Sequence, residues 1–136
     1  MANSFGNRSL GHLSTCHPDL QRLAYAVLEL MNISVLEGER SLAVQQLYYV
    51  AGKSKVRRGK HNTSPSRAVH FAPYPYQQTD MRPYYYLGGL VRAVAQEMGI
   101  RIVWGGDWDM DGDIYDQTFN DLMHFELEDD EDGTTD

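Results

Sequence analysis

The spacing of apolar residues constrains the fold of this chain more than any other feature, because the spacing changes along the sequence. In the segment 18–31, apolar side chains recur at the period of an α-helix with one buried face. These side chains are Leu20, Leu23, Ala24, Val27 and Met31. Pro18 suits the first turn of a helix, and Ser14, Thr15 or His17 is available as its cap. The segment therefore predicts an amphipathic helix.

Other segments predict two more helices and four short strands. The helices are expected over 41–50, ended by Gly52, and along the apolar positions of 87–98, ended by Gly99. The strands are expected over 33–36, 67–72, 100–104 and 123–127. Helices come first and short strands mostly follow, which is an order typical of an α+β domain.

Length and composition indicate a single globular domain. The chain has 136 residues, of which 42% are hydrophobic, enough for one buried core and too few for two modules. No apolar run approaches the roughly 20 residues that span a bilayer. The N-terminus lacks the basic and apolar regions of a secretory signal. We therefore expect no membrane insertion and no signal peptide. Cys16 is the only cysteine, which excludes an internal disulfide and predicts a small packing residue.

Charge is distributed unevenly along the chain. The net charge is −7, but six of the acids lie in the segment 128–136, which has no basic residue. The segment 1–127 is therefore almost neutral and is expected to form the domain, with 128–136 as a disordered acidic tail. The basic run 53–60 is short and falls in a predicted loop, so no nucleic-acid-binding surface is expected. This run is either a solvated loop or a contact to an anionic polymer.

Two of the five histidines lie on predicted strands, where alternate side chains point to opposite faces. His70 and His124 lie on the face opposite to the apolar one, which carries Val69, Phe71, Met123, Phe125 and Leu127. Each strand thus directs one imidazole away from the core, and His61 lies on the loop that leads into the first strand. Three imidazoles leave the fourth corner of a tetrahedron for water, which is the arrangement of a catalytic zinc site.

The segment 107–116 contains a second candidate metal site. Carboxylates at alternate positions followed by a glycine resemble the opening of a calcium-binding loop. The residues are Asp107, Asp109, Asp111 and Gly112, with Asp116 nearby. The glutamate that closes an EF-hand loop is absent, because Thr118 stands at its position. Packing many carboxylates without a counter-ion is costly, so we expect a cation such as calcium. The alternative is a solvated acidic loop.

Several runs of residues form an ordered set of motifs. They are His17-Pro18-Asp19-Leu20, Glu37-Gly38-Glu39-Arg40-Ser41 with Gln45, Lys60-His61-Asn62, Arg67-Ala68-Val69-His70-Phe71-Ala72-Pro73-Tyr74, Trp104-Gly105-Gly106-Asp107-Trp108 and Asp121-Leu122-Met123-His124-Phe125-Glu126-Leu127. In this order, they resemble the motifs of the phage L-alanyl-D-glutamate endopeptidases, and the resemblance extends from about residue 9 to 127. That family belongs to a group of zinc metallopeptidases related to D-alanyl-D-alanine carboxypeptidases and to the hedgehog signalling domain.

The resemblance implies a fold, an activity and residue roles. It implies a short, mainly antiparallel sheet with helices packed on one side, and a phage endolysin that cuts the peptide stems of peptidoglycan with zinc. The family motifs place zinc ligands at His61, His70 and His124 and a general base at Asp121. They also imply that Arg40 contacts the substrate or the developing oxyanion and that Gln45 binds substrate.

The chain departs from the family pattern at the middle ligand. His70 stands where the family usually has aspartate, and the loop from His61 to His70 is longer than the family's usual spacing. Imidazole is an ordinary zinc ligand, but three imidazoles make the site more positive. A working His70 needs a hydrogen-bond acceptor at its second nitrogen. The alternatives are a D-alanyl-D-alanine carboxypeptidase or dipeptidase, and a non-catalytic wall-binding or virion relative.

The resemblance also implies where the protein acts. Without a signal peptide, we expect it to accumulate in the host cytoplasm until lysis and then to act on the cell wall, with the virion as the alternative location. The expected partner is the peptide stem of peptidoglycan, and the expected oligomeric state is a monomer.

Overall fold

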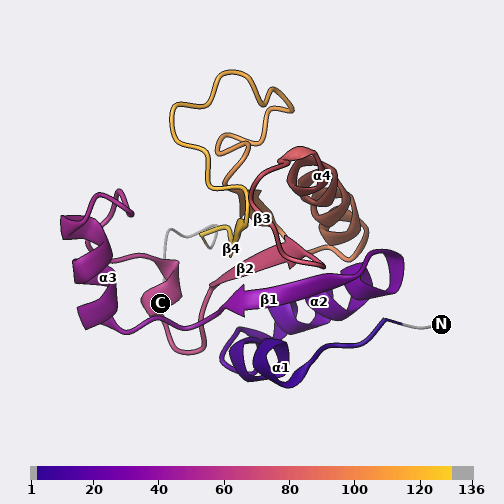
Figure 1. The fold of residues 1–136 in the computed structure, drawn as a ribbon, viewed down its shortest axis with the longest axis horizontal. Coiled ribbons are helices and arrows are strands. Elements are labelled where there is room, and N and C mark those ends of the chain that lie inside the picture. The colour runs from indigo at the N-terminus through magenta and orange to yellow at the C-terminus, as the bar shows by residue number, and fades with distance from the viewer. Residues whose placement is uncertain (1–2, 130–136) are drawn as a thin grey trace.

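A computed structural model describes residues 3–129 and shows four strands joined in one antiparallel sheet (Figure 1). The strands are β1 (Ile33–Glu37), β2 (Ala68–Pro73), β3 (Ile102–Trp104) and β4 (His124–Leu127), in the spatial order β1-β2-β4-β3. The helices are α1 (Asn7–Leu13), α2 (Pro18–Leu30), α3 (Leu42–Val50) and α4 (Arg82–Glu97), with a short 3-10 helix η1 (Lys60–Asn62). The predicted α+β class with an antiparallel sheet is confirmed.

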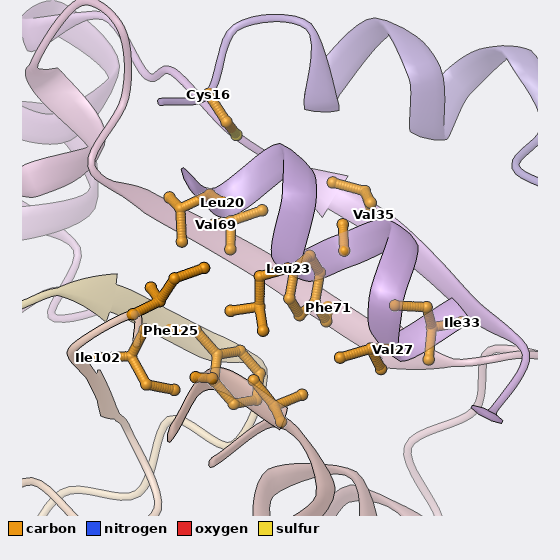
Figure 2. Packing of buried hydrophobic residues seen from close by; sticks show 14 of the residues in the cluster. Cys16, Leu20, Leu23, Val27, Ile33, Val35, Val69, Phe71, Ile102 and Phe125 are labelled. Carbon is orange, nitrogen blue, oxygen red and sulfur yellow. The ribbon is translucent and has the colours of Figure 1, made fainter. Parts of the chain in front are cut away.

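The core lies between one face of the sheet and the helices α2 and α4. The apolar stripe of α2 packs against the apolar faces of β2 and β4, as Figure 2 shows. The residues of this contact that the figure labels are Leu20, Leu23, Val27, Val69, Phe71 and Phe125. All of them are fully buried, and burial of apolar surface is the main force that holds such layers together. The apolar residues of the predicted helix and of the predicted strands therefore form one core.

The start of α2 shows how local sequence sets an element boundary. Pro18 occupies the first turn, and the ring nitrogen Nδ1 of His17 accepts a hydrogen bond from the backbone N–H of Asp19 at 3.0 Å. His17 is therefore the cap among the three candidates in the sequence. Cys16, just before it, is buried in the core as predicted, and burial raises the pKa of its thiol to about 11.

Three helical stretches were not expected from the apolar pattern, namely α1, η1 and the first turns of α4. α1 has few apolar residues and contains Gly11, so its pattern is weak. It is held by tertiary contact, because the hydroxyl of Ser9 accepts a hydrogen bond from the backbone N–H of Val35 at 3.0 Å and so covers the edge of β1. α4 begins at Arg82, well before Leu87, and Pro83 lies in its first turn.

α3 lies apart from the other helices at one end of the molecule (Figure 1). Ser41 caps it, since its hydroxyl accepts a hydrogen bond from the N–H of Val44 at 3.2 Å. Gln45 is the only buried residue of α3, so this helix supplies no apolar side chain to the core.

The acidic tail expected over 128–136 lies mostly outside the described residues. Glu128 and Asp129 are described, and they form ion pairs with Arg101 at 3.0 Å and with Lys60 at 3.0 Å. Disorder of the remaining tail and the boundary at 127 stay predictions. Within residues 3–129, no helix is both long and apolar enough to span a membrane.

Candidate metal centre and groove

Three imidazoles meet on the face of the sheet that does not form the core. His61 comes from η1, His70 from β2 and His124 from β4. The ring centroids are separated by 4.7 Å for His61 and His70, 5.1 Å for His61 and His124, and 5.5 Å for His70 and His124. One nitrogen of each ring lies within 4.8 Å of one nitrogen of each of the others. The described residues can therefore hold a metal ion at this point.

The backbone places these side chains through strand pairing and a tight loop. β2 and β4 are paired so that His70 stands directly opposite His124, and cross-strand partners point to the same side of a sheet. η1 is tied back to the start of β2 by a hydrogen bond from Arg67 N–H to the carbonyl of Lys60 at 3.0 Å. The carbonyl of His61 itself accepts from Arg40 N–H at 2.7 Å.

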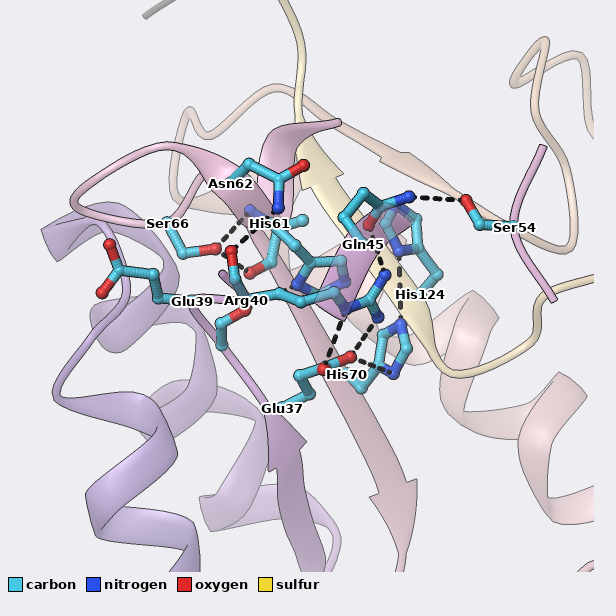
Figure 3. A network of polar contacts seen from close by, with 12 residues as sticks. Glu37, Glu39, Arg40, Gln45, Ser54, His61, Asn62, Ser66, His70 and His124 are labelled. Atoms are coloured by element: carbon cyan, nitrogen blue, oxygen red, sulfur yellow. Dashed lines mark hydrogen bonds and ion pairs between the residues drawn. The ribbon is translucent and has the colours of Figure 1, made fainter. Parts of the chain in front are cut away.

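Each imidazole has an oxygen atom near the nitrogen that points away from the other two rings, and Figure 3 shows this for Glu37 and His70. Nδ1 of His61 lies 2.6 Å from the carbonyl oxygen of Gly38. Nε2 of His124 lies 2.8 Å from a carboxylate oxygen of Glu126, and Nδ1 of His70 lies 3.6 Å from a carboxylate oxygen of Glu37. Such acceptors fix ring orientation and the position of the ring proton in metal sites.

The remaining nitrogens turn towards one another. Nε2 of His70 and Nδ1 of His124 are 3.4 Å apart. Nε2 of His61 is buried and has no hydrogen-bond partner among residues 3–129. A buried polar atom without a partner is costly, and a metal ion bound between the rings would satisfy it.

A bulge in β1 brings Glu37 to His70. Up to Val35, β1 pairs regularly with β2, but the register shifts between Val35 and Glu37, so that Glu37 rather than Leu36 stands opposite His70. An extra residue in one strand re-aims the side chains that follow it. The bulge therefore places a carboxylate 3.6 Å from Nδ1 of His70, at ion-pair distance, and the same carboxylate accepts hydrogen bonds from Arg40.

Burial sets the protonation of the cluster. Burial, and then the charge of His124, lower the pKa of His61 to about 4. Burial, and then the neighbouring His61 and His124, hold the pKa of His70 well below its ordinary value. Burial opposes ionisation of Glu126, but its hydrogen bond to His124 and the charge of Lys60 keep its pKa below the usual value. His61 and His70 are therefore neutral near pH 7, which is the form that binds metals.

Arg40 is fixed beside the cluster by two side chains. Its Nε donates to a carboxylate oxygen of Glu37 at 3.0 Å, and its Nη1 donates to Oε1 of Gln45 at 2.7 Å. The amide nitrogen of Gln45 donates to the hydroxyl of Ser54 at 2.8 Å and to the carbonyl of Val56 at 2.7 Å. Gln45 is 1% exposed, and these hydrogen bonds give both its amide oxygen and its amide nitrogen partners within the protein.

Asp121 is positioned by the turn that precedes β4. Its N–H donates to the carbonyl of Gly105 at 2.9 Å, and its own carbonyl accepts from His124 N–H at 3.1 Å. A side chain at position 105 would come 2.0 Å from the carbonyl oxygen of Asp121, so only glycine permits this approach. Burial raises the pKa of the Asp121 carboxyl, against the opposing charges of His124 and Arg40.

The cluster lies at the bottom of a groove with a volume of about 900 Å³. One side is formed by the segment 45–60, and the other by residues 108–126. Trp108 and Phe119 stack with ring centroids 6.2 Å apart, and Lys55 places its ammonium 5.5 Å from the Phe119 ring across the groove. Arg40, Gln45 and Asp121 line the same groove.

The four carboxylates predicted to bind calcium also lie close together in the structure. Asp107, Asp109, Asp111 and Asp116 each place a carboxylate oxygen within 4.8 Å of the others. Asp107 is 1% exposed, and its Oδ2 accepts from Gly112 N–H at 2.8 Å. Its Oδ1 is buried without a hydrogen-bond partner among residues 3–129. Gly112 has a φ of 86°, which suits glycine. The structure therefore groups the four carboxylates that the sequence had singled out.

Several residues of the centre were not given a role by sequence reasoning. Glu126 lies two positions from His124 on the same strand face, so strand alternation carries a signal for it. Glu37 depends on the β1 bulge, and the carbonyl of Gly38 depends on a close chain approach, where a side chain would come 2.4 Å from the hydroxyl oxygen of Thr15. Neither of these has a sequence pattern of its own.

Comparisons with known proteins show which family the chain resembles. The sequence model of the family described as phage L-alanyl-D-glutamate peptidase matches residues 1–128. The L-alanyl-D-glutamate peptidase of Escherichia phage T5 is 29% identical over 125 residues, which cover 86% of this chain and 90% of that protein. The crystal structure of the Serratia marcescens L-Ala D-Glu endopeptidase ChiX is similar with a TM-score of 0.75 and 32% identity, covering 93% of this chain and 91% of that one.

Proposed function

This chain belongs to the phage L-alanyl-D-glutamate peptidase family, and from that premise we propose that it hydrolyses the L-alanyl-D-glutamate bond in the peptide stems of bacterial peptidoglycan. The proposal includes a zinc ion held by His61, His70 and His124. The observation that carries it is the convergence of three imidazoles that line one groove, each with an oxygen atom of Gly38, Glu126 or Glu37 near its outward nitrogen.

The donor set fits zinc. Zinc in catalytic sites takes three protein ligands, often imidazoles, and leaves one position open. Nε2 of His61 is buried without a hydrogen-bond partner in residues 3–129, so it is available to bind the metal. When bound, zinc supplies Lewis acidity, which lowers the pKa of water and polarises a carbonyl group.

The departure at position 70 is compatible with a working site. The aspartate that the family usually has would bring a negative charge to the metal, and here a carboxylate, that of Glu37, lies behind the imidazole of His70 and is shared with Arg40. This arrangement supports His70 as a metal ligand, because its imidazole is neutral and lies between the other two rings and Glu37.

We propose that Asp121 transfers a proton from the attacking water to the leaving amine. Its raised pKa makes the carboxylate a better base than an ordinary aspartate. It would take a proton from the attacking water and give it to the amine that leaves. Peptide-bond hydrolysis needs both transfers, and one carboxyl group can perform them in sequence.

Arg40 is proposed to stabilise negative charge on the substrate carbonyl oxygen. A cation fixed before the reaction stabilises developing charge more effectively than a mobile one. Glu37 and Gln45 fix the guanidinium group, so we propose that Gln45 serves substrate binding through Arg40.

The acidic loop is proposed to bind calcium. Oxygen ligands from Asp107, Asp109, Asp111 and Asp116 suit this ion, and the orphaned Oδ1 of Asp107 supports a bound cation. The loop continues into the groove wall at Trp108, so calcium would order that wall. We further propose that the protein acts as a monomer on the cell wall after accumulating in the host cytoplasm.

Metal analysis tests the zinc site. The purified protein should contain about one zinc ion per chain, and His61→Ala or His124→Ala should remove it. His12→Ala provides a matched control, because His12 is exposed and lies outside the cluster. Wild-type protein that takes up no zinc, even when zinc is added, would refute the site.

A further inference from the structure

α3 is composed mostly of apolar residues, and it leaves them exposed. Its sequence is LAVQQLYYV, and Leu47 and Val50 are 68% and 85% exposed. Ala43, Leu47 and Val50 share one helix face by their spacing, on the side away from the buried Gln45. A contiguous exposed apolar surface marks a contact site.

The same region carries a concentration of positive charge. Between Glu39 and Asp80 the chain has no acidic residue and holds seven of its twelve lysines and arginines. Four of these follow α3 directly and are exposed: Lys53, Lys55, Arg57 and Arg58. None of the four lies within ion-pair distance of a carboxylate in residues 3–129.

Two of these cations lie beside the tyrosines of α3. The ammonium group of Lys53 lies 5.8 Å from the ring centroid of Tyr48, and the guanidinium group of Arg57 lies 5.1 Å from that of Tyr49. Val56, between these two cations in sequence, is 48% exposed. Apolar, aromatic and basic side chains thus neighbour one another along the segment that we call the α3 surface (α3 and residues 51–58). Lys53 and Lys55 also line the groove, whereas Leu47, Val50, Arg57 and Arg58 do not.

We propose that the α3 surface docks on membranes that contain anionic phospholipids. Such a membrane offers both negative headgroups for the cations and an apolar layer for Leu47 and Val50. Peptidoglycan is anionic but has no apolar layer, so it would leave these two side chains in water. The net charge of −7 does not oppose the contact, because salt screens charges more than about 10 Å away.

The docking is peripheral. α3 has nine residues, and at about 1.5 Å per residue it reaches less than half the roughly 30 Å of a bilayer core. The inference goes beyond the proposed peptidase function and does not depend on it. Docking would hold the protein at the boundary between membrane and wall.

Vesicle flotation tests the proposal with the full chain. The protein should float with vesicles of phosphatidylglycerol and phosphatidylethanolamine but not with vesicles of phosphatidylcholine alone, and binding should weaken as salt increases. Leu47→Gln/Val50→Gln should lower the partition coefficient about tenfold or more. Leu30→Gln is the matched control, because Leu30 is 65% exposed at the end of α2.

A second pair of variants tests how much the positive charges contribute to vesicle binding. Arg57→Gln/Arg58→Gln should weaken binding by about fivefold for each charge removed. Arg8→Gln/Arg22→Gln removes two exposed cations elsewhere and should leave binding nearly unchanged.

Four results would overturn the proposal. One is absence of binding to the anionic vesicles, and another is an equal effect of the Leu47 and Leu30 substitutions. A dimer in analytical ultracentrifugation that Leu47→Gln dissociates would assign the surface to a second copy of the chain. Binding to lipid-free sacculi that is lost in Leu47→Gln would assign it to the wall. Cleavage of soluble stem peptides, measured in parallel, reports on the peptidase alone.

Discussion

At the scale of single residues, the behaviour of the three imidazoles depends on the groups behind them. The outward nitrogens face a backbone carbonyl at Gly38 and the carboxylates of Glu37 and Glu126. These contacts leave one nitrogen per ring turned inward. The three acceptors differ in chemistry, and only two of them can be removed by substituting a side chain.

Glu37→Gln tests the acceptor of His70. The substitution removes the negative charge behind the imidazole while keeping a similar shape, so zinc affinity should fall about 10–100-fold. Competition with a chromogenic chelator measures the affinity. Glu39→Gln is the control, because Glu39 is an exposed glutamate on the same segment and should leave affinity unchanged. Equal affinities for the two variants would remove Glu37 from the site.

Asp121→Asn tests the proton acceptor. The amide keeps the shape of the carboxylate but has no basic oxygen, so the rate of stem cleavage should fall about 10²–10⁴-fold. Zinc content and melting temperature should stay near those of the wild type, because the ligands are intact. A variant that cleaves at nearly the wild-type rate would show that another group takes the proton.

At the scale of elements, the alternation of side chains along strands accounts for the part of the candidate site that could be predicted from the sequence. It placed His70 and His124 on the face away from the core, and the register of β2 and β4 brings them opposite each other. Glu37 could not be predicted, because a bulge interrupts the alternation of β1. α1 could not be predicted either, since the edge of β1 stabilises it rather than its own apolar pattern.

Gly105→Ala tests the turn that positions Asp121. The new methyl group would lie 2.0 Å from the Asp121 carbonyl oxygen, so the turn must shift, at a cost of about 1–3 kcal/mol, and activity should be lost. In Gly89→Ala, the methyl group meets no atom within 4 Å, and replacing a glycine inside α4 should stabilise by about 0.5–1 kcal/mol. Thermal melts and cleavage rates measure both effects. An active, stable Gly105→Ala variant would contradict the positioning role.

The acidic loop predicts a response to calcium. An ion that binds only the folded protein stabilises it by mass action, by about 2.7 kcal/mol at a hundredfold excess over its dissociation constant. Calcium should therefore raise the melting temperature of the wild type and have little effect on Asp109→Asn/Asp111→Asn. Asp113→Asn alters the same loop outside the four-carboxylate cluster and should keep the response. Calorimetry without heat at millimolar calcium would leave the loop as a solvated segment.

At the scale of the whole molecule, the fold separates the base of the groove from its two walls. The sheet, α2 and α4 form the core and carry His70 and His124. The walls of the groove come from the segment after α3 and from the loop that precedes β4. Loops on a rigid scaffold commonly determine which substrate is bound, and here Lys55 and Phe119 face each other across the opening.

Product analysis of purified peptidoglycan fragments with intact peptide stems tests the central claim most directly. Mass spectrometry after incubation with the zinc-loaded protein should show a glycan fragment that ends in L-alanine and a free peptide that begins with D-glutamate. A chelator should abolish this cleavage, and added zinc should restore it. Release of only terminal D-alanine, or intact stems after incubation with fully zinc-loaded protein, would contradict the account.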